Sequence, residues 1–352
     1  MTRPQVRDDL VALEGYHSPQ VDVRVRLNTN EAPSGPPQAF KDALAAELSR
    51  VEWNRYPDRE ATELRAGIAA FHDVDPAQVF VANGSNEVIQ TLCLAYGGAG
   101  RTCAIFEPTY RMHDQIASVT GMSTAIGRRA DDLSLDVDEV KRVVAESNPA
   151  ITFLCSPNNP TGMSEPPDAI KELADIVPGL LVVDEAYGQF AEWSALELVD
   201  EDRALVVTRT YSKTWSMAGA RLGYLIAPSW LVAELDKVTL PYHLDVAKQI
   251  AGRVALRFVD EMNERVADLV RERERLMARL RTMPVHVWPS EANFVLFRPE
   301  TKPGGEVWQA LLDRSILVRD TSSWPGLDGC LRVTIGTHDE DDAFLDALEG
   351  IL

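Results

Sequence analysis

The 352-residue sequence contains little cysteine, and its few thiols show no functional spacing. Cys93, Cys103, Cys155 and Cys330 lie within or beside apolar stretches, at separations that fit neither a metal site nor a disulfide framework. We therefore expect four buried, reduced thiols. The six histidines also lack metal-ligand spacing, so we predict no metal site.

Long apolar runs and an excess of positive charge are absent as well. No stretch approaches the roughly 20 apolar residues of a membrane-spanning helix, and residues 1–9 have no signal-peptide apolar core. With 54 acidic and 35 basic residues the net charge is −19, which disfavours nucleic acid or an anionic membrane as partner. We expect a cytoplasmic protein whose anionic substrates, if any, are bound by a local group of arginines.

Short apolar runs alternate with helical patterns from residue 79 to residue 227. The predicted strands cover 79–82, 102–106, 150–155, 180–183, 205–208 and 222–227, and predicted helices include 87–96, 137–146 and 169–176. This alternation predicts an α/β domain with a mostly parallel central sheet and helices on both faces. In such sheets, ligands bind beyond the carboxyl ends of the strands.

Beyond residue 242 the pattern becomes that of a smaller α+β domain. Residues 246–280 predict a long helical stretch, and the rest predicts strands at 292–298, 316–318 and 331–335 with a helix at 306–314. Thr337 and Glu340 form a capping-box pattern that opens the last helix. We expect three parts with an active site between the domains: 1–34 (an N-terminal arm with part of the small domain), 35–242 (the large domain) and 243–352 (the small C-terminal domain).

Groups with complementary chemistry follow several of the predicted strands. Lys213 ends the sequence Thr-Tyr-Ser-Lys, and Arg221 follows eight residues later. Asp184 ends an apolar strand, and Tyr187 lies three residues beyond it. A lysine for an aldehyde, an arginine for a phosphate and a carboxylate for a pyridine nitrogen are the groups that pyridoxal phosphate (PLP) requires.

Each segment has a plainer explanation when it is taken alone. Lys213 would be a surface lysine, Asp184 a helix cap, Tyr110 a packing residue, and segments 83–87 and 156–162 ordinary turns. Their order and spacing favour the functional interpretation. In that interpretation the small residues of 83–87 let backbone N–H groups approach a phosphate. Tyr110 then stacks on the cofactor ring, and Asp184 keeps the pyridine nitrogen protonated.

With these segments in register, the sequence resembles the fold-type I PLP-dependent aminotransferases of class I and II over nearly its full length. The motifs that carry the resemblance are Ser-Pro-Asn-Asn-Pro-Thr-Gly, Asp-Glu-Ala-Tyr, Ser-Lys and the arginine eight residues later. Segments 26–31, 55–58 and 318–337 are similar to those of the histidinol-phosphate aminotransferase family. The resemblance implies PLP as cofactor and 35–242 as the PLP-binding domain.

The resemblance also implies a role for each candidate residue. Lys213 is implied as the catalytic residue, which binds the cofactor aldehyde and moves the proton between the substrate α-carbon and the cofactor. The implied cofactor-binding residues are Gly84, Ser85, Asn86, Tyr110, Asn159, Asp184, Tyr187, Thr210, Ser212, Arg221 and, from the partner subunit of a homodimer, Tyr56. The implied substrate-binding residues are Tyr16, Asn30, Arg319 and Arg332.

The activity that the resemblance implies is ping-pong transamination between L-histidinol phosphate and 2-oxoglutarate, in histidine biosynthesis. Arg332 would bind the substrate carboxylate, Arg319 the substrate phosphate, and Tyr16 would close the pocket. Three alternatives stay open: an aromatic amino-acid aminotransferase, a PLP decarboxylase of a phosphorylated amino acid, and a PLP-binding regulator. Arg319 favours the phosphate substrate, because an aromatic side chain does not need a guanidinium.

Overall fold

Seven strands form the sheet of the large domain in the computed structural model, which describes residues 3–11, 13, 15 and 21–352. In spatial order they are β2 (Val79–Ala82), β8 (Gly223–Ile226), β7 (Leu205–Thr210), β6 (Leu180–Asp184), β5 (Ile151–Cys155), β3 (Thr102–Glu107) and β4 (Ser123–Arg128). Strands β3 to β7 pair in parallel, and β8 is antiparallel to both β2 and β7. The predicted mostly parallel sheet is confirmed.

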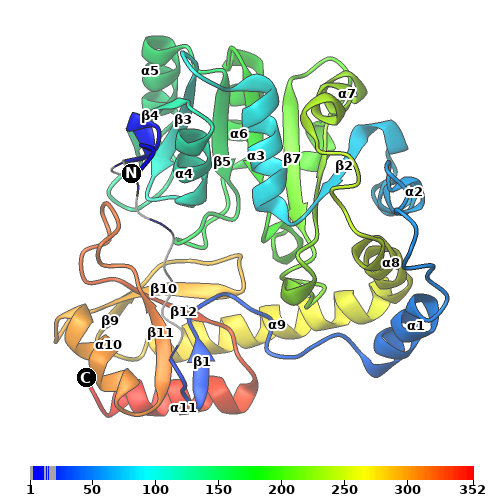
Figure 1. The fold of residues 1–352 in the computed structure, drawn as a ribbon. Coiled ribbons are helices and arrows are strands. Elements are labelled where there is room, and N and C mark those ends of the chain that lie inside the picture. Colours follow the sequence, from blue (N-terminus) through cyan, green and yellow to red (C-terminus); the bar gives the residue numbers. More distant parts are fainter. Residues whose placement is uncertain (1–2, 12, 14, 16–20) are drawn as a thin grey trace.

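Helices cover both faces of this sheet (Figure 1). Successive side chains of a strand point to opposite faces, so Ile105 packs into one apolar cluster and Phe106 into another. The first cluster includes side chains of α3 (Ser85–Tyr96), α4 (Met112–Val119) and α7 (Ser229–Val238). The second includes side chains of α5 (Val137–Ser147) and α6 (Pro167–Ile176).

A third cluster lies at the β2–β8 end of the sheet. It contains Val79, Tyr224 and apolar residues of α1 (Gln38–Leu48), α2 (Thr62–His72) and α8 (Val246–Ala255). Helix α8 therefore packs against helices of the large domain. The division of the chain into 1–34, 35–242 and 243–352 stays a prediction.

The small domain combines the two ends of the chain in one sheet. Its strands, in spatial order, are β1 (Val25–Leu27), β11 (Ile316–Asp320), β12 (Leu331–Thr334), β10 (Phe294–Pro299) and β9 (Val285–Val287). β1 pairs in parallel with β11, and the other pairs are antiparallel. The helices of this domain are α9 (Val259–Leu280), α10 (Gly304–Leu312) and α11 (His338–Glu349). The fold class, a large α/β domain with a smaller α+β domain, is confirmed.

The helical stretch predicted over 246–280 is confirmed, but it consists of two helices, α8 and α9. The chain leaves α8 through a 3-10 turn at Leu256–Phe258 before α9 begins. There the Phe258 ring meets the edge of the Phe40 ring of α1, with centroids 6.0 Å apart. The turn lets Phe258 pack in the large domain while α9 continues into the small one. The capping box of Thr337 and Glu340 at the start of α11 is confirmed.

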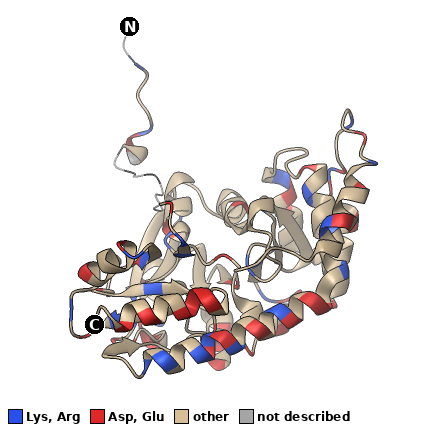
Figure 2. Ribbon diagram, turned by 90° about the horizontal axis from the view of Figure 1, so that it is seen from below, with Lys and Arg blue, Asp and Glu red and all other residues tan. Residues whose placement is uncertain are grey.

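Charge is spread over the molecule rather than gathered by sign. Figure 2 shows acidic and basic residues interspersed along α9. Within the described ranges, no helix combines the length and the apolar character that a membrane span requires. The four cysteines are free and buried, as predicted, and burial raises their pKa values, that of Cys103 to about 11.

Candidate active site

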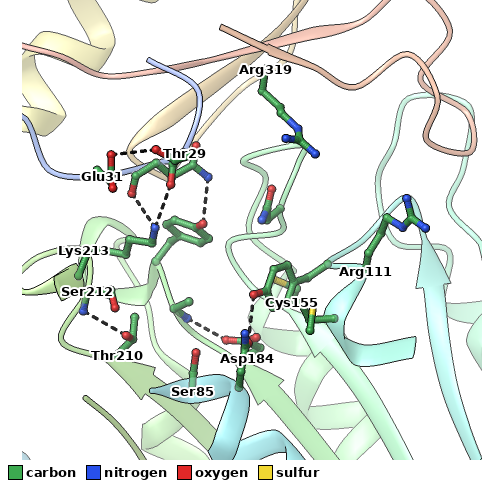
Figure 3. Close-up of a pocket in the computed structure, with 18 of the residues that line it drawn as sticks. Thr29, Glu31, Ser85, Arg111, Cys155, Asp184, Thr210, Ser212, Lys213 and Arg319 are labelled. Atoms are coloured by element: carbon green, nitrogen blue, oxygen red, sulfur yellow. Dashed lines mark hydrogen bonds between the residues drawn. The ribbon is translucent and has the colours of Figure 1, made fainter. Parts of the chain in front are cut away.

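A cavity of 540 Å³ opens beyond the carboxyl ends of β5, β6 and β7, bordered by residues of both domains (Figure 3). Most of the predicted site residues line it: Asn30, Ser85, Asn86, Tyr110, Asn159, Asp184, Tyr187, Thr210, Ser212, Lys213, Arg221, Arg319 and Arg332. Gly84 immediately precedes Ser85 at the cavity edge. Tyr56 does not belong to the described lining, and Tyr16 lies outside the described residues.

Lys213 follows β7 and is held by two backbone carbonyl groups. Its Nζ donates to the carbonyl oxygen of Asn30 at 2.7 Å and to that of Thr29 at 3.3 Å. Burial, together with the positive charges of Arg332 and Arg221, lowers the pKa of this amine to about 7. The amine is therefore substantially neutral near pH 7, which is the form that attacks a carbonyl carbon.

Asp184 is the last residue of β6, and both oxygens of its carboxylate have partners within the protein. Oδ1 accepts hydrogen bonds from the Ala186 N–H and from the Thr208 hydroxyl, each at 3.1 Å. Oδ2 lies 3.0 Å from Nε2 of His113. With 1% of its surface exposed, Asp184 places a fixed carboxylate at the base of the cavity.

His113 is a site residue that the sequence reasoning missed. It is completely buried, and its ring stacks on that of Phe153, with centroids 4.7 Å apart. The available signal was its position three residues after Tyr110, and the two rings do meet edge to face, with centroids 5.4 Å apart.

Glycines allow the start of α3 to approach Arg221 and β8 closely. Gly84 has φ +85°, and a Cβ there would lie 2.8 Å from Nη2 of Arg221. A Cβ on Gly223 would lie 2.4 Å from the backbone nitrogen of Ser85. Both positions therefore require glycine.

Hydroxyl groups complete this corner of the cavity. Nη1 of Arg221 donates to Oγ of Ser212 at 3.4 Å, and the Ser212 N–H donates to Oγ1 of Thr210 at 3.1 Å. Together with the N–H groups at the start of α3, a guanidinium and hydroxyl groups form a cradle suited to a phosphate. The cradle, the Asp184 carboxylate and the Lys213 amine fit the phosphate, pyridine nitrogen and aldehyde of PLP.

The remaining polar residues form three hydrogen-bonded pairs. Nδ2 of Asn30 donates to the hydroxyl of Tyr187 at 2.9 Å, and burial raises the pKa of this phenol. Nη1 of Arg332 donates to Oδ1 of Asn159 at 2.5 Å. The hydroxyl of Tyr110 donates to Oδ1 of Asn86 at 3.1 Å. These contacts fix side chains around the cavity before any ligand binds.

Arg319 and Arg332 occupy facing positions on β11 and β12. Figure 3 shows Arg319 extending from the small domain toward the cavity. Both arginines therefore contribute positive charge to the cavity wall.

The fold and the site together define the class of protein, a fold-type I PLP-dependent enzyme. Residues 23–348 match the family described as aminotransferase class I and II, and the chain belongs to that family. It is 44% identical over 352 residues to the histidinol-phosphate aminotransferase of Mycobacterium marinum (strain ATCC BAA-535 / M), covering 97% of this chain and 91% of the relative. The predicted resemblance is thus confirmed.

Two further comparisons agree. The histidinol-phosphate aminotransferase of Frankia casuarinae is 44% identical over 358 residues, covering 97% of this chain and 89% of that protein. The crystal structure of histidinol-phosphate aminotransferase from Sinorhizobium meliloti, in complex with pyridoxal-5'-phosphate, has a TM-score of 0.85 at 23% identity. That match covers 94% of this chain and 91% of the other, and it confirms the fold.

Proposed function

We propose that this protein is a histidinol-phosphate aminotransferase that acts in histidine biosynthesis. With PLP it converts L-histidinol phosphate and 2-oxoglutarate into imidazole-acetol phosphate and glutamate. The observation that carries the proposal is that two facing arginines, Arg319 and Arg332, line the same cavity as the Lys213 amine. The names of the relatives, matched over nearly the full chain, support the same substrate.

Four groups are proposed to hold the cofactor phosphate: Arg221, the hydroxyls of Thr210 and Ser212, and the N–H groups that follow Gly84. PLP supplies an electron-withdrawing ring that stabilises negative charge on the substrate α-carbon. The Asp184 carboxylate holds a proton on the pyridine nitrogen, because a buried negative charge favours the cationic form of a neighbouring base. Tyr187 and Asn159, which line the same cavity, are proposed to donate hydrogen bonds to the phenolic oxygen of the ring.

Lys213 would hold the cofactor through its aldehyde group, and its amine would also move the proton that leaves the substrate α-carbon. A pKa of about 7 suits a group that must both accept and release a proton near neutral pH. The carbonyl groups of Thr29 and Asn30 hold Nζ in position by accepting hydrogen bonds from it.

The substrate groups are proposed to divide between the two domains. Arg332, held by Asn159, binds the α-carboxylate of glutamate or 2-oxoglutarate through a bidentate pair. Arg319 binds the phosphate of histidinol phosphate, which has no α-carboxylate. Asn30 contacts the substrate beside Lys213, and closure of the pocket by Tyr16 stays a prediction.

A homodimer with shared sites belongs to the same proposal. Tyr56 is 80% exposed, and its ring stacks on that of Tyr242, with centroids 4.5 Å apart. An exposed aromatic pair is suited to contact with a second copy of the chain, where Tyr56 would reach the partner's cofactor phosphate. The four free, buried thiols support a cytoplasmic location.

Absorbance of the PLP-loaded protein tests the proposed function. L-Histidinol phosphate, L-phenylalanine and L-glutamate are added in parallel, and loss of the visible band to a near-ultraviolet band reports the first half-reaction. We expect histidinol phosphate to act at the lowest concentration. A better response to phenylalanine would establish the aromatic aminotransferase instead. Release of carbon dioxide from a phosphorylated amino acid would establish the decarboxylase.

A further inference from the structure

Arg111 is a cavity residue to which the proposed function gives no task. It follows Tyr110 directly and precedes α4, so it borders the cavity on the large-domain side. Figure 3 shows Arg111 and Arg319 extending from opposite sides of the gap between the domains. Gln115 of α4 and Trp324 of the small domain line the same cavity.

The Arg111 guanidinium is available to a ligand. Among the described residues it forms no hydrogen bond or ion pair with a side chain, and it is exposed. The charge of Arg111 favours a lower pKa for the nearby carboxyl group of Glu107. Burial has the larger effect and raises the pKa of Glu107. By contrast, Arg332 is already bound to Asn159 and to the backbone oxygen of Asn28. Arg111 therefore keeps its hydrogen-bond donors free.

A phosphate monoester needs more than one cation. At pH 7 it carries a charge of about −1.5 to −2 and has three acceptor oxygens. One guanidinium fork occupies two oxygens and neutralises one charge. The protein as a whole has net charge −19, so the overall field opposes binding of a dianion. A second arginine in the cavity would neutralise more of the phosphate charge and donate to its remaining oxygen. It would also oppose the negative overall field locally.

We propose that Arg111 is a specificity-determining residue that binds the substrate phosphate together with Arg319. This inference rests on the proposed function and extends it to a residue of the large domain. Arg319 approaches from the small domain and Arg111 from the large domain, so the phosphate links the two walls of the cavity. The phosphorylated substrate is thereby favoured over the same molecule without its phosphate.

A matched substrate pair tests this assignment. L-Histidinol phosphate and L-histidinol differ only by the phosphoryl group, so the ratio of their kcat/KM values isolates phosphate recognition. We expect Arg111→Ser to lower this ratio about tenfold, which corresponds to loss of one charge-assisted hydrogen-bonding group. Arg111→Lys keeps the charge and is expected to retain part of the ratio.

Arg128 provides the control. Like Arg111 it acts electrostatically on Glu107, but it does not belong to the described cavity lining. Arg128→Ser is therefore expected to leave the ratio unchanged. If it lowers the ratio as much as Arg111→Ser does, Arg111 acts only through Glu107 and the inference is overturned.

The same data separate the two levels of proposal. If the unaltered enzyme shows no preference for histidinol phosphate over histidinol, the proposed function fails. A clear preference that survives in Arg111→Ser leaves the proposed function standing and removes Arg111 from phosphate recognition.

Discussion

Arg319 and Arg332 are directly opposite each other on the antiparallel strands β11 and β12. Facing residues of such strands have Cβ atoms about 4.5–5.5 Å apart, and like charges in this relationship are destabilising. Two facing positive charges suit a site that receives anionic groups, because the bound anions offset the repulsion between the arginines. The cross-strand register sets the spacing between the carboxylate and phosphate positions that we propose.

Arg332 is expected to matter most for the amino-acid half-reaction. We expect Arg332→Lys to raise the half-saturating concentration of glutamate about 10–100-fold, because a lysine cannot form the bidentate pair. The effect on histidinol phosphate should be smaller, since that substrate has no α-carboxylate. Single-turnover absorbance with each substrate measures both values. Equal effects on the two substrates would contradict the assignment of Arg332 to the carboxylate.

The depressed pKa of Lys213 predicts a pH dependence for cofactor uptake. Protonated amine predominates below the pKa of about 7 and cannot attack the aldehyde. The rate at which the PLP-free protein binds PLP covalently should rise about tenfold between about pH 6 and pH 8 and then level off. Stopped-flow absorbance measures this rate. A rise that continued beyond pH 9 would mean that Lys213 has the pKa of an ordinary exposed lysine.

Asp184 is expected to control the rate rather than the attachment of the cofactor. We expect Asp184→Asn to lower kcat about 10²–10³-fold, because the pyridine nitrogen loses its anionic partner. The visible absorbance band of the PLP-loaded variant should persist, since Lys213 is unchanged. Steady-state kinetics and absorbance measured on the same sample decide this. Loss of the band would instead show that Asp184 is needed for cofactor binding itself.

Gly223 tests the close approach of β8 to α3. We expect Gly223→Ala to raise the dissociation constant for PLP more than about tenfold, because the new methyl group would lie 2.4 Å from the backbone nitrogen of Ser85 and must displace it. Gly305→Ala is the control, since a Cβ at this position of α10 meets nothing within 4 Å. Fluorescence titration of the PLP-free variants measures the affinity. Equal affinity in the two variants would show that the phosphate cradle tolerates the displacement.

Mixing two inactive variants tests the shared dimer site. A Lys213→Ala subunit paired with a Tyr56→Ala subunit restores one complete site if Tyr56 acts across the interface. After random reassociation, about a quarter of the sites would be complete, since half of the dimers would be mixed. Activity of the mixture is compared with that of each variant alone. If mixing restores no activity, Tyr56 does not act across the interface.

Strand and site positions were largely predictable because their signals are local. The strand at 79–82 was predicted with the bounds that the structure has, since four apolar residues precede a glycine turn. Lys213, Asp184 and Arg221 were found from sequence spacing, and all three line one cavity. Their chemistry is carried by residue type and by position at the ends of strands.

The contacts that were not predicted depend on tertiary structure. Strand β4 was not predicted, because it is an edge strand whose residues are largely exposed. Its sequence therefore lacks a buried apolar run. His113 was set aside because no metal spacing involves it, whereas its partner Asp184 is 71 residues away. The carbonyl groups that hold Lys213 come from a segment more than 180 residues earlier, and no local pattern reveals them.

The pairing of β1 with β11 has a consequence for how this protein is made. The hydrogen bond from the Arg24 N–H to Oγ of Ser315 spans 291 residues. The ribosome must therefore synthesise nearly the whole chain before β1 can pair with β11. The large domain has all of its strands by residue 226 and can collapse while synthesis continues. The small-domain sheet is therefore completed late in synthesis. The carbonyl groups of Thr29 and Asn30 reach Lys213 only when the N-terminal segment packs against the C-terminal part of the chain.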